Sequence, residues 1–139
     1  MKSLEVYIDG ASKGNPGPSG IGVVICRDGS PIKNISSYIG NATNNVAEYT
    51  ALIYALEEAL ILKADALKVK TDSELLHRQL MKIYKIKDPG IRGLFERVSR
   101  LIAAFKSVEI THIPREENKG ADRLATKAVR EALVKKVLG

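Results

Sequence analysis

The feature that most constrains the fold of this 139-residue chain is the order of its segments with strand-like and helix-like hydrophobic periodicity. Residues 3–9 alternate apolar and polar side chains, residues 20–26 form an apolar run, and residues 31–40 follow an Asp-Gly-Ser turn signal. These three segments predict three consecutive strands. The remaining pattern predicts a helix over 44–62, a strand over 67–71, helices over 73–81 and 90–105, a strand over 107–113 and a helix over 118–137.

A strand meander followed by crossover units cannot form a purely parallel or a purely antiparallel sheet. The order β-β-β-α-β-α-α-β-α therefore predicts an α/β fold, with a mixed five-stranded sheet and helices on both faces. Residues 10–20 are dense in Gly and Pro and are predicted to form the turn between the first two strands.

The composition predicts one soluble globular domain over residues 1–139, with 45% hydrophobic and 27% charged residues. No apolar run reaches the roughly 20 residues that cross a bilayer, and the N-terminus enters a strand without a signal-peptide pattern. The single cysteine, Cys26, has no internal partner. We therefore expect a cytoplasmic monomer that makes no contact with membranes. The scarcity of glutamine beside many Lys, Glu and Ile is a feature of thermophilic proteins.

The net charge of +6 is unevenly distributed along the chain. Residues 77–92 hold five Lys or Arg side chains and one Asp, and residues 123–139 hold five and one Glu, so each segment carries +4. The remainder of the chain is net acidic. This distribution favours a polyanionic substrate, although either basic segment is equally consistent with a solvated helix face.

Four acidic residues stand at the edges of predicted elements. Asp9 and Asp72 end strands, while Glu48 and Asp122 lie near the starts of helices. Strand ends and helix starts can meet at one edge of an α/β sheet, where such folds place their ligands. Four carboxylates at one place would repel one another, and divalent metal relieves that repulsion. The pattern therefore indicates metal-dependent phosphoryl chemistry. We expect the helix dipoles to help keep Glu48 and Asp122 ionised.

Each acid also has a structural explanation. Asp9 is followed by Gly10 and is consistent with a turn residue, and Glu48 lies where a capping-box partner of Asn45 would lie. Asp72 or its neighbour Ser73 is a possible helix cap, and Asp122 is a possible first-turn acid behind an Asn118 cap.

Four segments carry a resemblance to a known family: YIDGASKGNPGPSGIGVVI, TNNVAEYTALIYAL, VKTDSELLHRQL and THIPREENKGADRLA. In this order they are similar to the successive motifs of type 1 ribonuclease H, over nearly the whole chain. The resemblance implies cleavage of the RNA strand of RNA–DNA hybrids, leaving 5′-phosphate and 3′-hydroxyl ends. It also implies a ligand set of Asp9, Glu48, Asp72 and Asp122 for two Mg²⁺ ions, or Mn²⁺, with Asp9 as the bridging ligand.

In the implied mechanism, water attacks the phosphodiester in line between two ions roughly 3.5–4 Å apart. The resemblance further implies that Asn44 and Glu48 read 2′-hydroxyl groups, and that Asn15, Thr43 and Asn44 hold the hybrid backbone. Turn formation by Asn15 and helix capping by Thr43 or Asn44 are the alternatives. Contacts of this kind carry no base code, so largely sequence-independent cleavage is expected.

His112 ends the last predicted strand, ten residues before Asp122. Some members of the resembled family carry a mobile histidine there that assists proton transfer or product release, and a strand-end histidine without a catalytic part is the alternative. The large basic protrusion of some members is missing. Lys82, Lys85 and Lys87 are expected to replace it on a smaller scale in binding the hybrid.

Two other functions are compatible with parts of this pattern. A resolvase or transposase core, which is a related polynucleotidyl transferase, shares the acids and the sheet but not the Gly-Asn-Pro-Gly and Thr-Asn-Asn-x-x-Glu segments. A non-catalytic nucleic-acid-binding module would gain nothing from four acids at one site.

Overall fold

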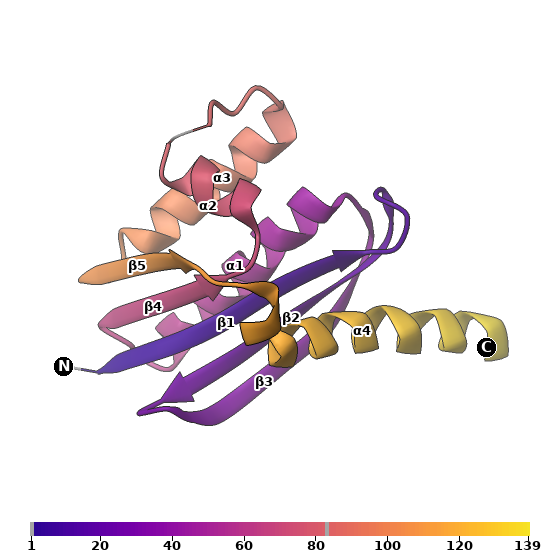
Figure 1. The fold of residues 1–139 in the computed structure, drawn as a ribbon, viewed down its shortest axis with the longest axis horizontal. Coiled ribbons are helices and arrows are strands. Elements are labelled where there is room, and N and C mark those ends of the chain that lie inside the picture. The colour runs from indigo at the N-terminus through magenta and orange to yellow at the C-terminus, as the bar shows by residue number, and fades with distance from the viewer. Residues whose placement is uncertain (1, 83) are drawn as a thin grey trace.

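The computed structural model describes residues 2–82 and 84–139. Five strands form one mixed sheet in the order β3-β2-β1-β4-β5, which confirms the predicted fold class (Figure 1). β1 pairs antiparallel with β2 and parallel with β4, and β4 pairs parallel with β5. The elements are β1 (Ser3–Ser12), β2 (Gly17–Arg27), β3 (Ser30–Ala42), α1 (Asn44–Ile61), β4 (Ala66–Thr71), α2 (Glu74–Leu80), α3 (Pro89–Ile102), β5 (Ser107–His112), the 3-10 turn η1 (Arg115–Glu117) and α4 (Lys119–Leu138).

The prediction of a turn over residues 10–20 is wrong in extent. Antiparallel pairing continues past Asp9, through Gly10 opposite Ile21, to Ser12 opposite Ser19. The true connection comprises residues 13–16, and the backbone N–H of Lys13 donates to the carbonyl of Pro18 at 2.9 Å. Gly10 and Gly20 of this segment lie in strands, at places where α1 and α4 approach them closely, which composition alone does not reveal.

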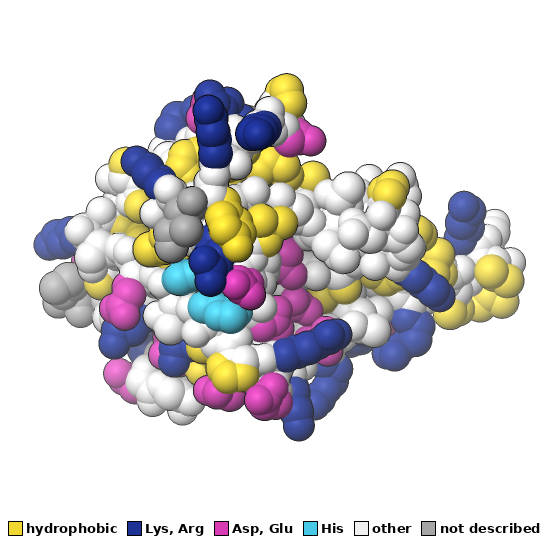
Figure 2. Space-filling view, turned by 45° about the horizontal axis from the view of Figure 1, so that its top comes forward, with side chains coloured by type: hydrophobic (Ala, Val, Ile, Leu, Met, Phe, Trp, Pro, Cys, Tyr) yellow, Lys and Arg dark blue, Asp and Glu magenta, His cyan; other side chains and the backbone are white. Residues whose placement is uncertain are grey.

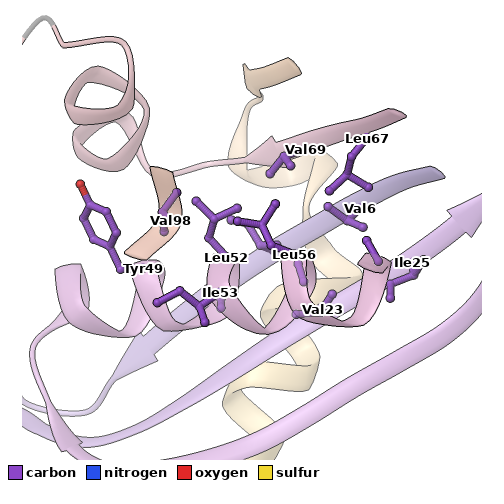
Figure 3. Close-up of a cluster of buried hydrophobic side chains, with 14 of the residues drawn as sticks. Val6, Val23, Ile25, Tyr49, Leu52, Ile53, Leu56, Leu67, Val69 and Val98 are labelled. Atoms are coloured by element: carbon purple, nitrogen blue, oxygen red, sulfur yellow. The ribbon is translucent and has the colours of Figure 1, made fainter. Parts of the chain in front are cut away.

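The main core lies between α1 and one face of the sheet (Figure 3). Leu52 and Leu56 of α1 point toward Val6 and Val69 of the central strands, and all four are fully buried. These helix positions recur at a spacing of four residues, so one stripe of α1 covers the sheet. The stripe fixes the rotation of α1 about its axis, and with it the direction of the functional side chains in its early turns.

The opposite face of the sheet is covered by α4 over β1, β2 and β3, and the C-terminal half of α4 extends beyond the sheet (Figure 1). Ala121, Ala125 and Ala128 are the small buried residues at this contact. Their size lets the helix backbone approach the sheet. Within residues 2–82 and 84–139, the structure holds no helix that is both long and apolar enough to cross a membrane.

Candidate active site

Three carboxylates from three different elements meet at one edge of the sheet. Asp9 of β1, Glu48 of α1 and Asp72, which follows β4, each place one carboxylate oxygen so that these atoms lie within 4.8 Å of one another. Asp9 and Glu48 are buried, with exposed fractions of 6% and 7%, and Asp72 is half-buried. The structure thus brings together three of the four predicted acids as a compact group.

The fourth acid, Asp122, borders Asp9 from the other face of the sheet. Asp9 pairs with Gly22 of β2, and a Cβ on Gly22 would lie 2.0 Å from the carbonyl oxygen of Ala121. Only glycine therefore lets the first turns of α4 come this close to β2. The resulting contact brings the Asp122 carboxyl near Asp9, whose pKa it helps to raise, although Asp122 lies outside the group of three.

Glu48 is held by β1 and not by its own helix. Its Oε1 accepts a hydrogen bond of 2.9 Å from the backbone N–H of Gly10, and Thr43 is the residue that caps α1, accepting from Val46 N–H. The capping-box alternative for Glu48 is therefore wrong. Gly10 is again a site of close approach, because a Cβ there would lie 2.4 Å from the carbonyl carbon of Ala47.

The group is electrostatically strained in the absence of metal. Burial, with repulsion from Glu48 and Asp72, raises the pKa of Asp9 to about 10. Burial raises the pKa of Glu48 to about 7, against the opposing effect of the Gly10 hydrogen bond. Desolvation is the largest influence on Glu48, which lies beyond the first turn of α1, where the helix dipole acts most strongly.

Asp72 is positioned by Asn118, a residue whose place in the sequence is that of a helix cap. Asn118 is 1% exposed, and its Nδ2 donates to the Ile8 carbonyl at 2.8 Å and to Asp72 Oδ2 at 3.2 Å. Its side chain does not cap α4, as judged among the described residues. Ser73 caps α2 by accepting from Leu76 N–H, which leaves the Asp72 carboxylate free for the site.

The donor set fits a hard divalent cation. All of the groups that converge are carboxylates, which Mg²⁺ and Mn²⁺ prefer over nitrogen or sulfur. Glu48 Oε2 is buried and, within residues 2–82 and 84–139, has no hydrogen-bond partner. A buried carboxylate oxygen without a donor is costly, and a bound cation would satisfy it.

The predicted backbone-binding residues are clustered beside this group. Asn15 Oδ1 accepts from the Asn44 backbone N–H at 2.9 Å, and Asn44 Oδ1 accepts from Ser12 N–H at 3.0 Å. These bonds tie the β1–β2 connection to the start of α1. Because Asn44 uses its oxygen in this way, its NH₂ group is the part left to donate to a ligand. Asn15, Thr43 and Asn44 also line one cavity of about 450 Å³, together with Lys87.

The three predicted lysines divide between two neighbouring cavities. Lys82 and Lys85 line a cavity of about 480 Å³ with Tyr84 and Arg92, whereas Lys87 lines the cavity of Asn15. Gln79 and Ile86 line both cavities, so the two hollows adjoin. A basic, partly aromatic surface thus continues from the start of α1 along the α2–α3 connection.

Both histidines of the chain lie beside the acids (Figure 2). His112, at the end of β5, places Nε2 3.3 Å from the backbone oxygen of Asp72. His77 of α2 lies against it, with ring centroids 5.9 Å apart and ring planes inclined by 31°. His112 therefore lies against the backbone of Asp72, and His77 is an additional neighbour that the sequence placed only on a helix.

Comparison with known proteins identifies the family. A family model described as "Reverse transcriptase-like" matches residues 7–128. Ribonuclease HI of Halobacterium salinarum is 42% identical over 130 residues, and the match covers 93% of this chain and 65% of that protein. Bifunctional protein Rv2228c of Mycobacterium tuberculosis is 40% identical over 129 residues, which cover 91% of this chain and 35% of that protein. The chain thus spans about two thirds and one third of these relatives.

Solved structures agree with the sequence matches. The crystal structure of RNase H1 from Halobacterium salinarum superimposes with a TM-score of 0.91 at 41% identity, covering 93% of this chain and 98% of that one. LC11-RNase H1, solved in complex with an RNA/DNA hybrid, gives a TM-score of 0.88 at 42% identity, and the match covers 94% of this chain and 99% of that one. The fold, the motifs and these matches together show that the chain belongs to the type 1 ribonuclease H family.

Proposed function

We propose that this protein hydrolyses the RNA strand of RNA–DNA hybrids with divalent metal, leaving 5′-phosphate and 3′-hydroxyl ends. The observation that carries the proposal is the convergence of Asp9, Glu48 and Asp72 oxygens within 4.8 Å, bordered by Asp122. The relative whose structure contains an RNA/DNA hybrid supports the choice of substrate. Neither a resolvase core nor a non-catalytic binder has comparable support from the family matches.

Asp9, Glu48, Asp72 and Asp122 would hold the metal, which we propose to be two Mg²⁺ ions, with Mn²⁺ as a substitute. Metal bound by these residues would supply activation of water and stabilisation of the charge on the departing oxygen. The protein supplies position and a low-dielectric environment. Asp9 is central because it contacts Glu48 from α1 on one side and Asp122 from α4 on the other.

Recognition of the hybrid is proposed to use backbone and sugar contacts. The Asn44 NH₂ group can donate to a 2′-hydroxyl or phosphate oxygen, and Asn15 holds Asn44 in place through its backbone N–H. Thr43 faces the same cavity while it caps α1. The Glu48 carboxylate is the second 2′-hydroxyl reader in this proposal. His112 is proposed to assist proton transfer or product release. A cytoplasmic, monomeric enzyme with a single domain stays a prediction from the sequence.

Cleavage of a labelled RNA–DNA hybrid tests the proposal, with Mg²⁺, with Mn²⁺ and in EDTA. We expect metal-dependent cleavage of the RNA strand and no cleavage of a plain DNA duplex. Asp9→Asn should abolish cleavage and retain hybrid binding, whereas Asp88→Asn, at an exposed helix cap, should retain both. More than about a tenth of wild-type turnover in Asp9→Asn, a barrier change under roughly 1.4 kcal/mol, would remove Asp9 from the metal site.

The basic surface is tested separately. Replacing Lys82, Lys85 and Lys87 by Gln should weaken hybrid binding and lower its salt dependence, by about 0.9 in the log–log slope for each phosphate that is no longer neutralised. Turnover at saturating hybrid should stay near the wild-type value, because these side chains line cavities outside the carboxylate group. An unchanged slope would show that the three lysines are an ordinary solvated surface.

A further inference from the structure

His77 and His112 form a pair that the proposed function does not explain. They come from separate elements, α2 and the end of β5, and their ring centroids lie 5.9 Å apart. Both lie near the carboxyl ends of neighbouring strands, because α2 begins just after β4 and His112, which pairs with Thr71 of β4, is the last residue of β5. Both rings reach solvent: His77 is half-buried and His112 exposed. Two imidazoles are thus presented together beside the carboxylates (Figure 2).

The spacing of the rings suits two ligands of one ion. With a metal–nitrogen bond of about 2.1 Å, two imidazole centres bound to one tetrahedral ion lie roughly 5 Å apart. The observed 5.9 Å exceeds this by less than one ångström. Small rotations about the side-chain bonds of two partly exposed histidines close a gap of this size.

The second observation is the hydrogen bond made by His112. A backbone carbonyl can only accept, so the contact of 3.3 Å to the Asp72 oxygen requires Nε2 to carry the proton. This leaves Nδ1 as the unprotonated nitrogen that can bind a metal. Metal-binding histidines usually donate their other ring N–H to a carbonyl or carboxylate, which fixes the tautomer and the ring orientation. His112 already has that arrangement.

We propose that His77 and His112 form a binding site for a transition-metal ion of the Zn²⁺, Ni²⁺ or Cu²⁺ type, separate from the carboxylate group. Water completes the coordination shell. Imidazole nitrogen prefers these ions, whereas Mg²⁺ prefers oxygen and keeps most of its water. The two adjacent sites are therefore expected to select different metals from a mixture.

Occupancy of the histidine site has a consequence for activity, and this part rests on the proposed function. An ion bound to His112 withdraws the ring from proton transfer or product release. It also adds positive charge next to Asp72, which opposes binding of Mg²⁺ to the carboxylates. Zn²⁺ should therefore inhibit Mg²⁺-dependent cleavage through His77 and His112.

The chain offers a direct assay because it contains only two histidines. Zn²⁺ is titrated into ¹⁵N-labelled protein at neutral pH, and the imidazole signals are followed by NMR. The titration uses the Asp9→Asn background with excess Mg²⁺, so that the carboxylates do not compete for zinc. We expect both histidine signals to shift together and to saturate at one equivalent of zinc. Shifts of neither signal, or of the His112 signal alone, would refute the site.

His77→Gln is the test variant, because glutamine keeps helix propensity and polarity at a partly exposed position. It should weaken zinc binding at least about tenfold. It should retain Mg²⁺-dependent cleavage, and its inhibition by Zn²⁺ should need correspondingly more metal. Equal inhibition of wild type and His77→Gln would overturn the inhibitory role. The NMR titration does not need activity, so a protein without hybrid cleavage would refute the proposed function and leave the metal site measurable.

Discussion

Replacing Asp9 by asparagine should stabilise the metal-free protein, even though it removes the proposed central metal ligand. Asp9 is 6% exposed and is surrounded by Glu48, Asp72 and Asp122. Its pKa of about 10 lies far above the 3.8 of an exposed aspartate. The folded state therefore keeps Asp9 protonated at neutral pH, whereas the unfolded chain releases that proton.

The sign and size of the effect follow from this difference. An acid whose pKa is raised by folding destabilises the fold at every pH above its unfolded pKa, and the cost grows until pH passes the folded pKa. At pH 7, the distance from the unfolded pKa of 3.8 corresponds to a destabilisation of the fold by at most about 4 kcal/mol, at roughly 1.4 kcal/mol for each pKa unit. Asparagine is neutral at every pH and carries no such cost. Because its amide replaces only part of the hydrogen bonding, we expect a gain of roughly 1–3 kcal/mol.

Thermal melting in EDTA at neutral pH measures this gain. For a chain of this length, 1 kcal/mol corresponds to roughly 3–5 °C, so Asp9→Asn should melt several degrees above wild type. Asp88→Asn is the matched control, because Asp88 accepts from Gly90 and Ile91 N–H as an exposed cap, a role that asparagine also fills. Added Mg²⁺ should raise the melting temperature of wild type and much less that of Asp9→Asn. A lower melting temperature for Asp9→Asn in EDTA would refute the reasoning and make Asp9 a structural residue.

Three further perturbations probe the same geometry. As the pH rises from about 5 to about 9, the melting temperature of the metal-free wild type should decrease, because the fold opposes ionisation of Asp9 and Glu48. With Mg²⁺ present, the melting temperature should depend less steeply on pH. Gly22→Ala should lower the free energy of unfolding, measured in urea, by at least about 2 kcal/mol and should reduce cleavage, because its Cβ would overlap the α4 backbone. Gly29→Ala is the control: its Cβ has space, so it should cost less, through its positive φ alone, and leave cleavage unchanged. Asn118→Ala should cost about 1–3 kcal/mol and weaken Mg²⁺ binding measured by calorimetry, since Asp72 loses its donor.

The sequence predicted the four acids and the sheet because both signals are local. Asp9 and Asp72 end strands whose alternation is visible within a few residues, and Glu48 lies on a helix with a clear apolar stripe. In an α/β fold, strand ends and helix starts of this kind can meet at one edge of the sheet. The family resemblance implies the same four acids, and the structure brings oxygens of three of them within 4.8 Å of one another.

Asn118 shows what local reasoning could not supply. Before a helix, an asparagine is read as a cap because caps are the commonest local role for it. Its actual partners, Ile8 and Asp72, lie 110 and 46 residues away in the chain. The same holds for two glycines: Gly10 lies in β1 and not in the predicted turn, and Gly22 lies in a strand as predicted, but no local pattern shows that they admit the backbones of α1 and α4. Contacts between elements distant in sequence assigned these roles.

The arrangement around Asp9 also explains why the site can exist before metal binds. α1 approaches β1 at Gly10 and α4 approaches β2 at Gly22, so two helices on opposite faces of the sheet are fixed at the level of Asp9. The buried contacts of α1 with the sheet fix the helix backbone that carries Glu48, while Gly10 of β1 holds its carboxylate. Protonation of Asp9 and the hydrogen bond from Gly10 N–H to Glu48 reduce the repulsion among the carboxylates. The proposed metal would therefore have to displace protons from Asp9 and Glu48 when it binds. It follows that Mg²⁺ should bind more tightly as pH rises, because each carboxyl must lose its proton to act as a ligand.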